Sequence, residues 1–250
     1  RRPPRATPLY SSAASDVYKR QDRLHRMGVS AFKIGSGECN NLPLIEHVAA
    51  FGKPMIVSTG MNDLDAIAET VSLMEGKVEY ALLHCVNAYP QPYEATRLDC
   101  ITEMLEAFPG APIGLSDHTP TIWTALAAVA LGASIIEKHV TDRTNRPGPD
   151  NSFSLTPAQV FELIRASRAI KQAKGRGKGM AKCEEVTARF AFATVVTTKA
   201  VAKGEELTRE NTWVKRPGVG DYPAREYEGV LGQYAANSLP VGHHLMEGDL

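Results

Sequence analysis

APIGLSDHTPTIWTALAAVALGASIIEKHVTD, residues 111–142, has the order of a strand, a helix and a second strand. Two short apolar runs end in polar residues, and an alanine-rich segment of helical length separates them. Parallel strands are joined by helical connections of this kind. His118 and His139 follow the two runs, 21 positions apart, so we expect both imidazoles at one rim of a parallel sheet.

The same pattern of an apolar run, polar residues and a helical segment occurs five times along the chain. Strands that are apolar on both faces and alternate with helices indicate a parallel α/β sheet. The runs are AFKIG (31–35), PMIVST (54–59), YALLHC (80–85), APIGLS (111–116) and SIIEKH (134–139). The helices are expected at roughly 42–51, 63–75, 98–108, 120–131 and 156–172.

The remainder of the sequence suggests three further segments around the α/β part, which we place at 21–172. Residues 173–186 are rich in glycine and lysine and are expected to form a linker. Residues 187–250 contain short β-like runs broken by Gly, Pro and Asn, which predict a separate small β-rich domain. Residues 1–20 carry neither a helical nor a strand period, and we interpret them as a non-native or disordered tail.

The composition is that of an ordinary globular chain with balanced charge. Basic and acidic residues both number 28, so neither nucleic acid nor a membrane surface is expected as a partner. No apolar stretch reaches about 18 residues, the length that a membrane span needs. Cys39, Cys85, Cys100 and Cys183 form no CxxC pair, which argues against a disulfide scaffold or a zinc ribbon. We expect a cytoplasmic protein with reduced, buried thiols.

The residues directly after the apolar runs are rich in groups that can bind an anion. In a parallel barrel or an open sheet, the active site lies beyond the carboxyl ends of the strands. Hydroxyl groups, backbone NH groups beside glycine and a lysine can together bind phosphate. A single such residue is most often part of a turn, but five strand ends in succession favour a binding rim. The first three ends supply Lys33, Ser36, Glu38, Ser58, Thr59, Asn87 and Tyr89.

The fourth and fifth strand ends, SDHT and EKHVTD, supply the two imidazoles. Two neutral imidazoles at one rim are suitable ligands for a divalent metal. The alternative is a half-buried His118 that pairs with Asp117 or Glu137. His84 is expected to be structural, and the His243–His244 pair is expected in a surface turn of the β-rich domain.

Five segments together resemble the N-acetylneuraminate (sialic acid) synthase family, in its bacterial branch. The likeness extends from about residue 24 to the C-terminus. The segments are KIGSGECNNLPLIEHVAAFGKPMIVSTGMN (33–62), LLHCVNAYPQPYE (82–94), IGLSDHT (113–119), EKHVTDRTNRPGPD (137–150) and WVKRPGVGDY (213–222).

The resemblance implies a (β/α)8 TIM barrel followed by a SAF domain, which is similar to type III antifreeze protein. Family members condense phosphoenolpyruvate with N-acetylmannosamine, yielding N-acetylneuraminate and phosphate. They use a divalent metal, typically Mn2+, with Mg2+ or Co2+ as alternatives. The chain would then be α/β, with the last five βα units of the barrel before the SAF domain.

The resemblance also implies a role for each residue of the rim. His118 and His139 match the metal ligands. Glu38, Tyr89 and Asp150 match positions near the bound substrates, where a carboxylate would handle protons. Arg216 matches an arginine that contacts the sugar in the site of the neighbouring subunit, which implies a domain-swapped homodimer. The residues matching the phosphoenolpyruvate site are Lys33, Ser36, Ser58, Asn87 and Ser116.

The sequence departs from the family pattern before residue 33. Full members have the first three strands and helices there, and five βα units cannot close an eight-stranded barrel. We therefore expect an N-terminally truncated fragment that is inactive or poorly stable. Two other functions stay open: synthesis of a related nonulosonic acid, legionaminic or pseudaminic, and a non-catalytic binding role for the SAF domain.

Overall fold

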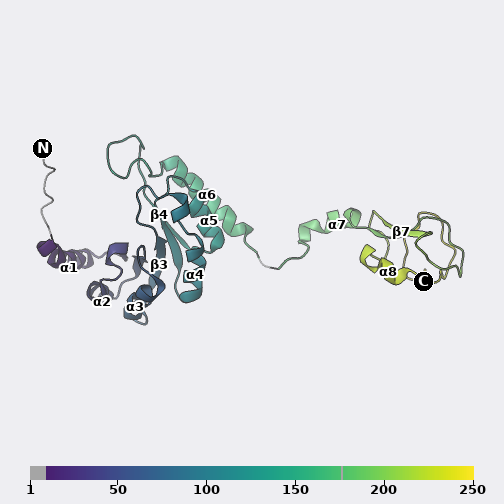
Figure 1. Cartoon of the computed structure of the whole chain (residues 1–250), viewed down its shortest axis with the longest axis horizontal. Helices are drawn as coiled ribbons and strands as arrows, with labels where there is room; N and C mark the ends of the chain where they lie inside the picture. The colour runs from purple at the N-terminus through teal and green to yellow at the C-terminus, as the bar shows by residue number, and fades with distance from the viewer. Residues whose placement is uncertain (1–9, 176) are drawn as a thin grey trace. The chain divides into compact units, whose positions relative to one another are not determined.

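The computed structural model describes residues 10–175 and 177–250, with side chains from residue 18 onward (Figure 1). The chain divides into two compact units, Arg1–Gly175 and Arg176–Leu250. The division falls inside the segment 173–186 that the sequence analysis assigns to a linker.

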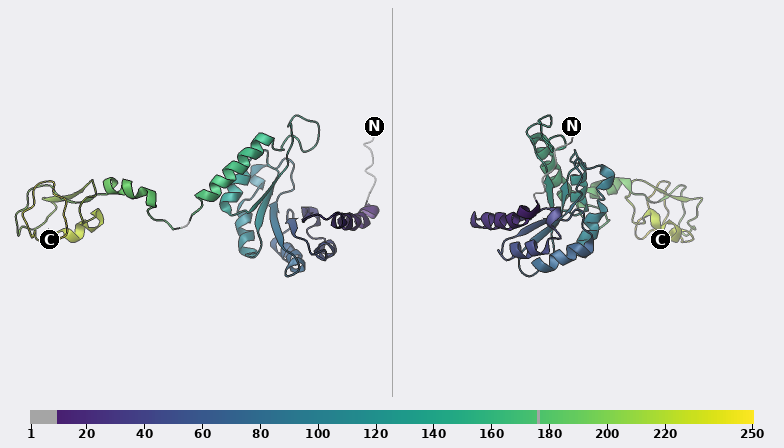
Figure 2. Two further views of the ribbon diagram at one scale, coloured as in Figure 1. Left: turned by 180° about the vertical axis from the view of Figure 1, so that it is seen from behind. Right: turned by 60° about the vertical axis from the view of Figure 1, so that its left-hand side comes forward.

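The first unit is built on a five-stranded sheet in which every strand is parallel to its neighbour. The strands follow the order of the sequence, so β1 and β5 are the edge strands of this sheet. The sheet curls as part of a barrel, as Figure 2 shows, and this confirms the predicted partial (β/α)8 architecture. The strands are β1 (Phe32–Ile34), β2 (Met55–Ser58), β3 (Tyr80–Cys85), β4 (Ile113–Asp117) and β5 (Ile135–Lys138).

Helices connect the strands, and two of them, α2 and α3, begin after residues whose side chains cap them. Asn41 and Asp63 accept hydrogen bonds from the backbone NH groups of Leu44 and Ala66, three positions further on. The helices are α1 (Tyr10–Arg26), α2 (Leu42–Ala49), α3 (Leu64–Met74), α4 (Asp99–Ala107), α5 (Trp123–Leu131) and α6 (Pro157–Ala173). Two short 3-10 helices, η1 (Ser36–Glu38) and η2 (Tyr93–Ala95), follow β1 and β3.

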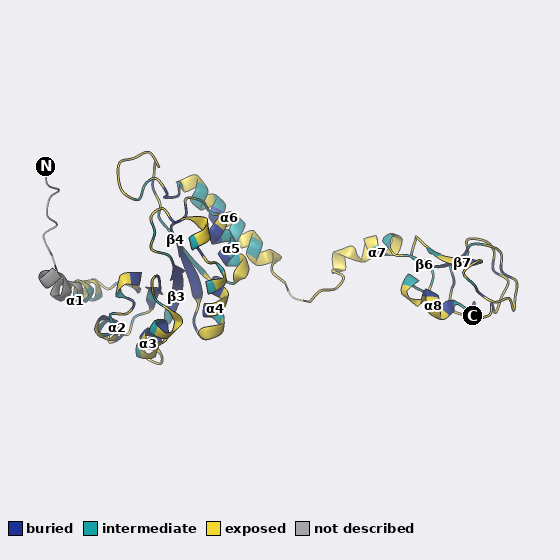
Figure 3. Cartoon of the chain, in the orientation of Figure 1, coloured by how far each residue is buried: buried dark blue, intermediate teal, exposed yellow. Residues whose placement is uncertain are grey.

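The two faces of the sheet have different chemistry. Successive strand residues point to opposite faces, and one set packs against the helices in a hydrophobic core that Figure 3 shows as buried strands. The alternate positions lie on the concave face, which carries the polar residues of the strand ends. The core members from the strands are Phe32, Ile34, Met55, Val57, Leu82, Ile113 and Leu115.

Helix α1 differs from the sequence expectation for residues 1–20. Residues 10–20 belong to this helix, whereas no helical period was expected there, and residues 1–9 lie outside the described residues. The helix ends before Gly28, whose φ of 76° suits the left-handed conformation that terminates many helices. Its apolar residues are few, but Tyr10, Ala13, Val17 and Leu24 recur at helical spacing, so the expectation that the segment carries no helical period is wrong.

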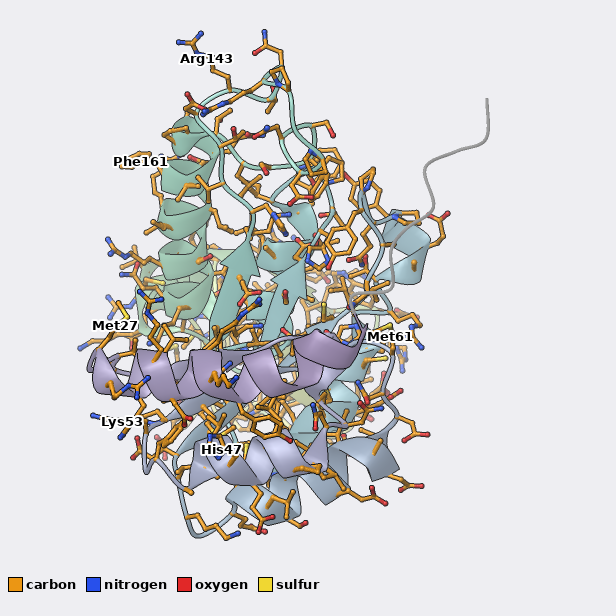
Figure 4. The ribbon with its side chains drawn as sticks, turned by 90° about the vertical axis from the view of Figure 1, so that its left-hand side faces the viewer. Met27, His47, Lys53, Met61, Arg143 and Phe161 are labelled. Carbon is orange, nitrogen blue, oxygen red and sulfur yellow. The ribbon has the colours of Figure 1, made fainter. Side chains whose placement is uncertain are left out.

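Aromatic contacts hold α1 against α2. The ring of His25 stacks on Phe51 with centroids 4.4 Å apart, and Tyr18 meets His47 edge-on at 5.3 Å. His47 Nε2 also lies 2.9 Å from Asp22 Oδ1. Figure 4 shows α1 lying beside α2, where His47 is labelled. Part of the segment interpreted as a tail is therefore packed on the first unit.

The second unit is a small fold with its own hydrophobic core. Its antiparallel strands β6 (Thr194–Thr197) and β7 (Thr212–Lys215) are extended by isolated β-bridges. The helical elements are η3 (Lys182–Glu184), α7 (Glu185–Ala191), η4 (Ala224–Glu226) and α8 (Tyr227–Val230). The core is formed by Val195, Val201, Leu207, Tyr227, Val230, Ala235, Leu239 and Leu245.

In neither described part of the chain does a helix have the length and apolarity needed to cross a membrane.

Candidate active site

Polar side chains from four strands meet on the concave face of the sheet. Lys33 Nζ donates a hydrogen bond to Ser58 Oγ at 2.7 Å and lies 3.4 Å from Glu137 Oε2. Ser116 Oγ donates to the other carboxylate oxygen of Glu137 at 2.9 Å. Lys33 and Glu137 are 37% and 44% exposed, and an ion pair this open to solvent is weak, so an anionic ligand can compete for the ammonium group. We call Lys33, Ser58, Ser116 and Glu137 the lysine cluster.

The loops after β1, β2 and β3 approach each other closely beside the lysine cluster. Ser36 Oγ accepts a hydrogen bond from the backbone NH of Gly60 at 3.0 Å, and Asn87 Oδ1 accepts one from Cys85 Sγ at 3.3 Å. A Cβ atom at Gly60 would collide with Asn87 Oδ1 and lie 2.9 Å from Ser36 Oγ. A larger residue at position 60 would have to displace these two side chains and would also press on the backbone carbonyl oxygen of Cys85, 3.0 Å from the Cβ position.

The two imidazoles are adjacent at the same rim. The ring centroids of His118 and His139 are 5.3 Å apart, and His118 Nδ1 lies 2.9 Å from the carbonyl oxygen of Val86. Burial lowers the pKa of His118 below its usual range; the Val86 carbonyl opposes this shift, and His139 adds to it. The ring is therefore neutral at pH 7, with its Nδ1 hydrogen on the carbonyl and its Nε2 lone pair free.

Aromatic rings and one carboxylate surround the imidazole pair. The ring of Tyr89 lies 4.2 Å from that of His118 and 6.1 Å from that of His139, measured between centroids. Phe153 packs edge-on against His139 at 5.3 Å. Asp150 Oδ2 is 3.6 Å from His139 Nδ1. Burial first, and then nearby acidic groups, raises the pKa of the Tyr89 hydroxyl, which stays protonated at neutral pH.

These donors suit an open metal site. In residues 10–175 and 177–250, no group of three or more His, Cys, Asp or Glu side chains is arranged to hold a metal ion. The imidazole pair could supply two nitrogen ligands, and the carbonyl behind His118 fixes its tautomer as carbonyls do behind metal-bound histidines. A divalent metal here would have to complete its coordination with water or substrate, and open positions are a feature of catalytic rather than structural sites.

The alternative pairing of His118 with an acidic neighbour is wrong. Asp117 Oδ2 lies 3.2 Å from Lys138 Nζ, on the helix side of the sheet, and Glu137 belongs to the lysine cluster. Sequence reasoning missed Lys138 altogether and gave Glu137 no role of its own. The only signal available was the alternation in SIIEKH, which places Glu137 and Lys138 on opposite faces.

No described contact joins Glu38 or Arg216 to the imidazoles, to the lysine cluster or to the side chains packed around Gly60. Glu38 lies on η1 with Ser36, and its Oε2 accepts a hydrogen bond from Asn41 Nδ2 at 2.7 Å. Arg216 is exposed and directly follows β7 in the second unit. Their roles stay predictions.

The remaining histidines and cysteines separate into structural and surface groups. His84 is buried, with Nε2 2.7 Å from the carbonyl oxygen of Thr96, as expected for a structural residue. His243 and His244 differ from the expected surface turn because both are half-buried and hydrogen-bonded, His243 to Asp249 Oδ2 at 2.6 Å. Cys183 is exposed and Cys100 is half-buried, so the expectation of buried thiols is confirmed for Cys39 and Cys85 only.

A cavity of about 800 Å3 lies elsewhere, beside the edge strand β5 and between α5 and α6. Its lining is largely apolar, with Ile136, Val140, Leu155 and Leu163 among the contributors. It includes neither imidazole, so the chemistry belongs to the polar rim and not to this cavity.

The NeuB family matches residues 9–179, which is most of the first unit and more than half of the chain. The chain belongs to the NeuB family. The match begins inside the segment 1–20 that the sequence analysis interprets as non-native. A SAF domain matches residues 192–250, in agreement with the predicted identity of the β-rich part.

The relatives of this NeuB-family chain include enzymes with different sugar products. It is 37% identical to N,N'-diacetyllegionaminic acid synthase of Campylobacter jejuni over 87% of this chain and 66% of that protein. It is 33% identical to human N-acetylneuraminate-9-phosphate synthase over 90% of this chain and 63% of that protein. The chain thus spans no more than about two thirds of these curated relatives.

A solved structure supports the same assignment. The N-acetylneuraminic acid synthetase of Leptospira borgpetersenii, crystallised with citrate, is 33% identical with a TM-score of 0.63. The likeness covers 66% of this chain and 59% of that one.

Proposed function

We propose that this chain is part of a nonulosonic acid synthase, an enzyme that joins phosphoenolpyruvate to an N-acetylated hexosamine and releases phosphate. The observation that carries the proposal is the lysine cluster, assembled from four strands at the rim where the two imidazoles lie. Membership of the NeuB family supports it, since named relatives are synthases of such sugar acids.

The lysine cluster and the neighbouring loops would bind phosphoenolpyruvate. Its phosphate and carboxylate need cationic and hydroxyl donors to offset their charge. Lys33 would exchange its contact with Glu137 for the ligand. The other proposed donors are Ser36, Ser58, Asn87 and Ser116.

His118 and His139 would hold a divalent metal, Mn2+ by preference, with Mg2+ or Co2+ as alternatives. When bound, the metal acts as a Lewis acid that makes the aldehyde carbon of the open-chain sugar electrophilic. The protein's own contribution is to keep the His118 imidazole neutral and to fix its tautomer through the Val86 carbonyl.

The reaction then forms one carbon–carbon bond and breaks one bond to phosphate. The methylene carbon of phosphoenolpyruvate attacks the aldehyde carbon, and the aldehyde oxygen takes up a proton. Water adds to the cationic carbon left behind and gives up a proton, and the resulting tetrahedral intermediate loses phosphate to leave a keto acid. Glu38 and Asp150 are the two candidate carboxylates for these proton transfers. Asp150 has the closer position, 3.6 Å from His139.

The sugar is proposed to be N-acetylmannosamine, which makes the product N-acetylneuraminate. Tyr89 and Asp150 would face the sugar, and Arg216 would reach it from a second copy of the chain in a domain-swapped homodimer. The legionaminic relative is evidence that related chains take other hexosamines, so a precursor of legionaminic or pseudaminic acid is the alternative.

The test is a condensation assay on the chain extended to the length of its relatives. The protein is incubated with Mn2+, phosphoenolpyruvate and a panel of N-acetylated hexosamines, and phosphate release and the mass of the product are measured. We expect a new keto sugar acid with N-acetylmannosamine, formed in amounts equal to the phosphate. Phosphate release without any condensation product, for every sugar of the panel, would contradict the proposal.

A further inference from the structure

The residues directly before the two imidazoles form an ion pair that the proposed mechanism does not use. Asp117 and Lys138 are the last residues of β4 and β5, and they are register partners in the sheet. Their side chains are 0% and 4% exposed. His118 and His139 are the next residues along the two strands.

Every hydrogen of the Lys138 ammonium group has an acceptor. Lys138 Nζ lies 3.2 Å from Asp117 Oδ2, and it donates to the carbonyl oxygens of Thr119 and Thr121 at 2.5 and 3.1 Å. An ammonium group has three hydrogens to donate. The lysine of β5 therefore binds the end of β4 and the loop that follows it at three points.

Asp117 is also hydrogen-bonded to the loop that follows β4 and to helix α5. Its Oδ1 accepts the backbone NH of Thr119 at 2.9 Å, and its Oδ2 accepts the hydroxyl of Thr124, on α5, at 2.6 Å. Because Asp117 and Thr119 flank His118, the backbone on both sides of this imidazole is fixed.

The ion pair and the imidazoles lie on opposite faces of the sheet. The carboxylate of Asp117 contacts α5, while the ring of His118 contacts Tyr89 and His139 on the concave side. This follows from strand geometry, in which successive side chains alternate. The pair thus joins the two strand ends from behind, one residue before each ligand.

A stabilising role alone does not account for this pair. Removing two charges from water costs about as much as their attraction returns, and buried ion pairs can often be replaced by apolar residues without loss of stability. A buried ion pair does, however, favour one arrangement of the two strand ends, because each charged group is hydrogen-bonded to particular partners.

We propose that Asp117 and Lys138 are positioning residues that set the separation and orientation of His118 and His139. They touch neither substrate nor metal and act through the backbone of the two strand ends. The expected effect on Mn2+ affinity rests on the proposed function, whereas the expected effect on the separation and orientation of the two rings does not.

The test compares Asp117→Asn/Lys138→Met, which removes both charges, with a matched control. Arg165→Met/Glu162→Gln removes an exposed ion pair on α6, where the side chains are 69% and 45% exposed. Two readouts are taken on the chain: the NOE between the ring protons of His118 and His139, and the Kd for Mn2+. Circular dichroism checks that each variant is folded.

We expect the buried double variant to be folded, to lose most of the NOE between the rings, and to bind Mn2+ about tenfold more weakly or worse. The control is expected to match the wild type in both readouts. If the pair only stabilises the fold, its removal would lower the free energy of unfolding and leave the NOE unchanged. Wild-type NOE intensity and Mn2+ affinity in the folded double variant would overturn the proposal.

Two further outcomes remain informative. If the wild type binds no Mn2+ but the NOE is lost in the double variant, the proposed metal site fails while the positioning role stands. If the double variant does not fold, Thr124→Val removes one bond to Asp117 with little change in volume. This variant should reduce the NOE in part, and an unchanged NOE would overturn the proposal.

Discussion

Lys33 Nζ lies 2.7 Å from Ser58 Oγ and 3.4 Å from Glu137 Oε2, so a residue of the first strand bridges residues of the second and the fifth on the concave face. The contact with Ser58 joins neighbouring strands. The contact with Glu137 crosses the face from β1 to β5, between strands at opposite ends of the sheet order. Curling of the sheet makes this possible.

Replacing Lys33 should weaken the binding of phosphoenolpyruvate. A charge-assisted hydrogen bond contributes about 1.5–3 kcal/mol, so Lys33→Met is expected to raise the Kd by about tenfold or more. Isothermal titration calorimetry of the chain with Mn2+ present measures this. Lys77→Met, which removes an exposed lysine before β3, is the control and should leave the Kd unchanged. Equal Kd values for phosphoenolpyruvate in the two variants would show that Lys33 does not contribute to its binding.

Gly60 should not tolerate a methyl group. Its Cβ would collide with Asn87 and press on Ser36, so Gly60→Ala is expected to cost about 1–3 kcal/mol of unfolding free energy and to weaken phosphoenolpyruvate binding. Gly110→Ala is the matched control, because nothing lies within 4 Å of its Cβ position. Urea denaturation and calorimetry provide the two values. If Gly60→Ala matched Gly110→Ala in unfolding free energy and in affinity for phosphoenolpyruvate, the loops around Gly60 would be loosely packed.

Acid should destabilise the first unit partly through His84. Burial lowers the pKa of His84 in the folded chain below its ordinary value of 6.5, with the Thr96 carbonyl and nearby charges as smaller influences. Below pH 6.5 the unfolded chain then binds more protons than the folded one, so the free energy of unfolding falls as the pH falls through and below this value.

His84→Gln should flatten this pH dependence between about pH 5 and 7. Urea unfolding followed by Trp123 fluorescence in a Trp213→Phe background reports on the first unit, since these are the two tryptophans of the chain. An unchanged slope in His84→Gln would mean that His84 is not among the groups responsible.

The sequence predicts the fold well because strand patterns are local. Each apolar run coincides with its strand to within a few residues, and the residues after the runs lie at the rim that the rule for parallel sheets predicts. The imidazole pair follows from the spacing of a single strand–helix–strand unit. Lys33, Ser58 and Ser116 follow from the same rule applied to other strands.

What the sequence could not provide is the pairing across strands. The Asp117–Lys138 pair depends on the register of β4 and β5, and the Lys33–Glu137 contact depends on the curvature of the sheet. Neither quantity is encoded in a local pattern. Helix α1 is a different case, because a local signal is present: Tyr10, Ala13, Val17 and Leu24 recur at helical spacing in a segment that is otherwise polar, and the interpretation as a tail overlooks it.

The central claim is that the lysine cluster and the imidazole pair form one site, with phosphoenolpyruvate beside a metal. The most direct measurement is the 31P relaxation rate of phosphoenolpyruvate in the presence of the chain and Mn2+, because a paramagnetic ion accelerates it only at short range. We predict strong acceleration with the wild-type chain and a return to the protein-free level with His118→Ala/His139→Ala. Equal rates for the wild type and this double variant would contradict the claim.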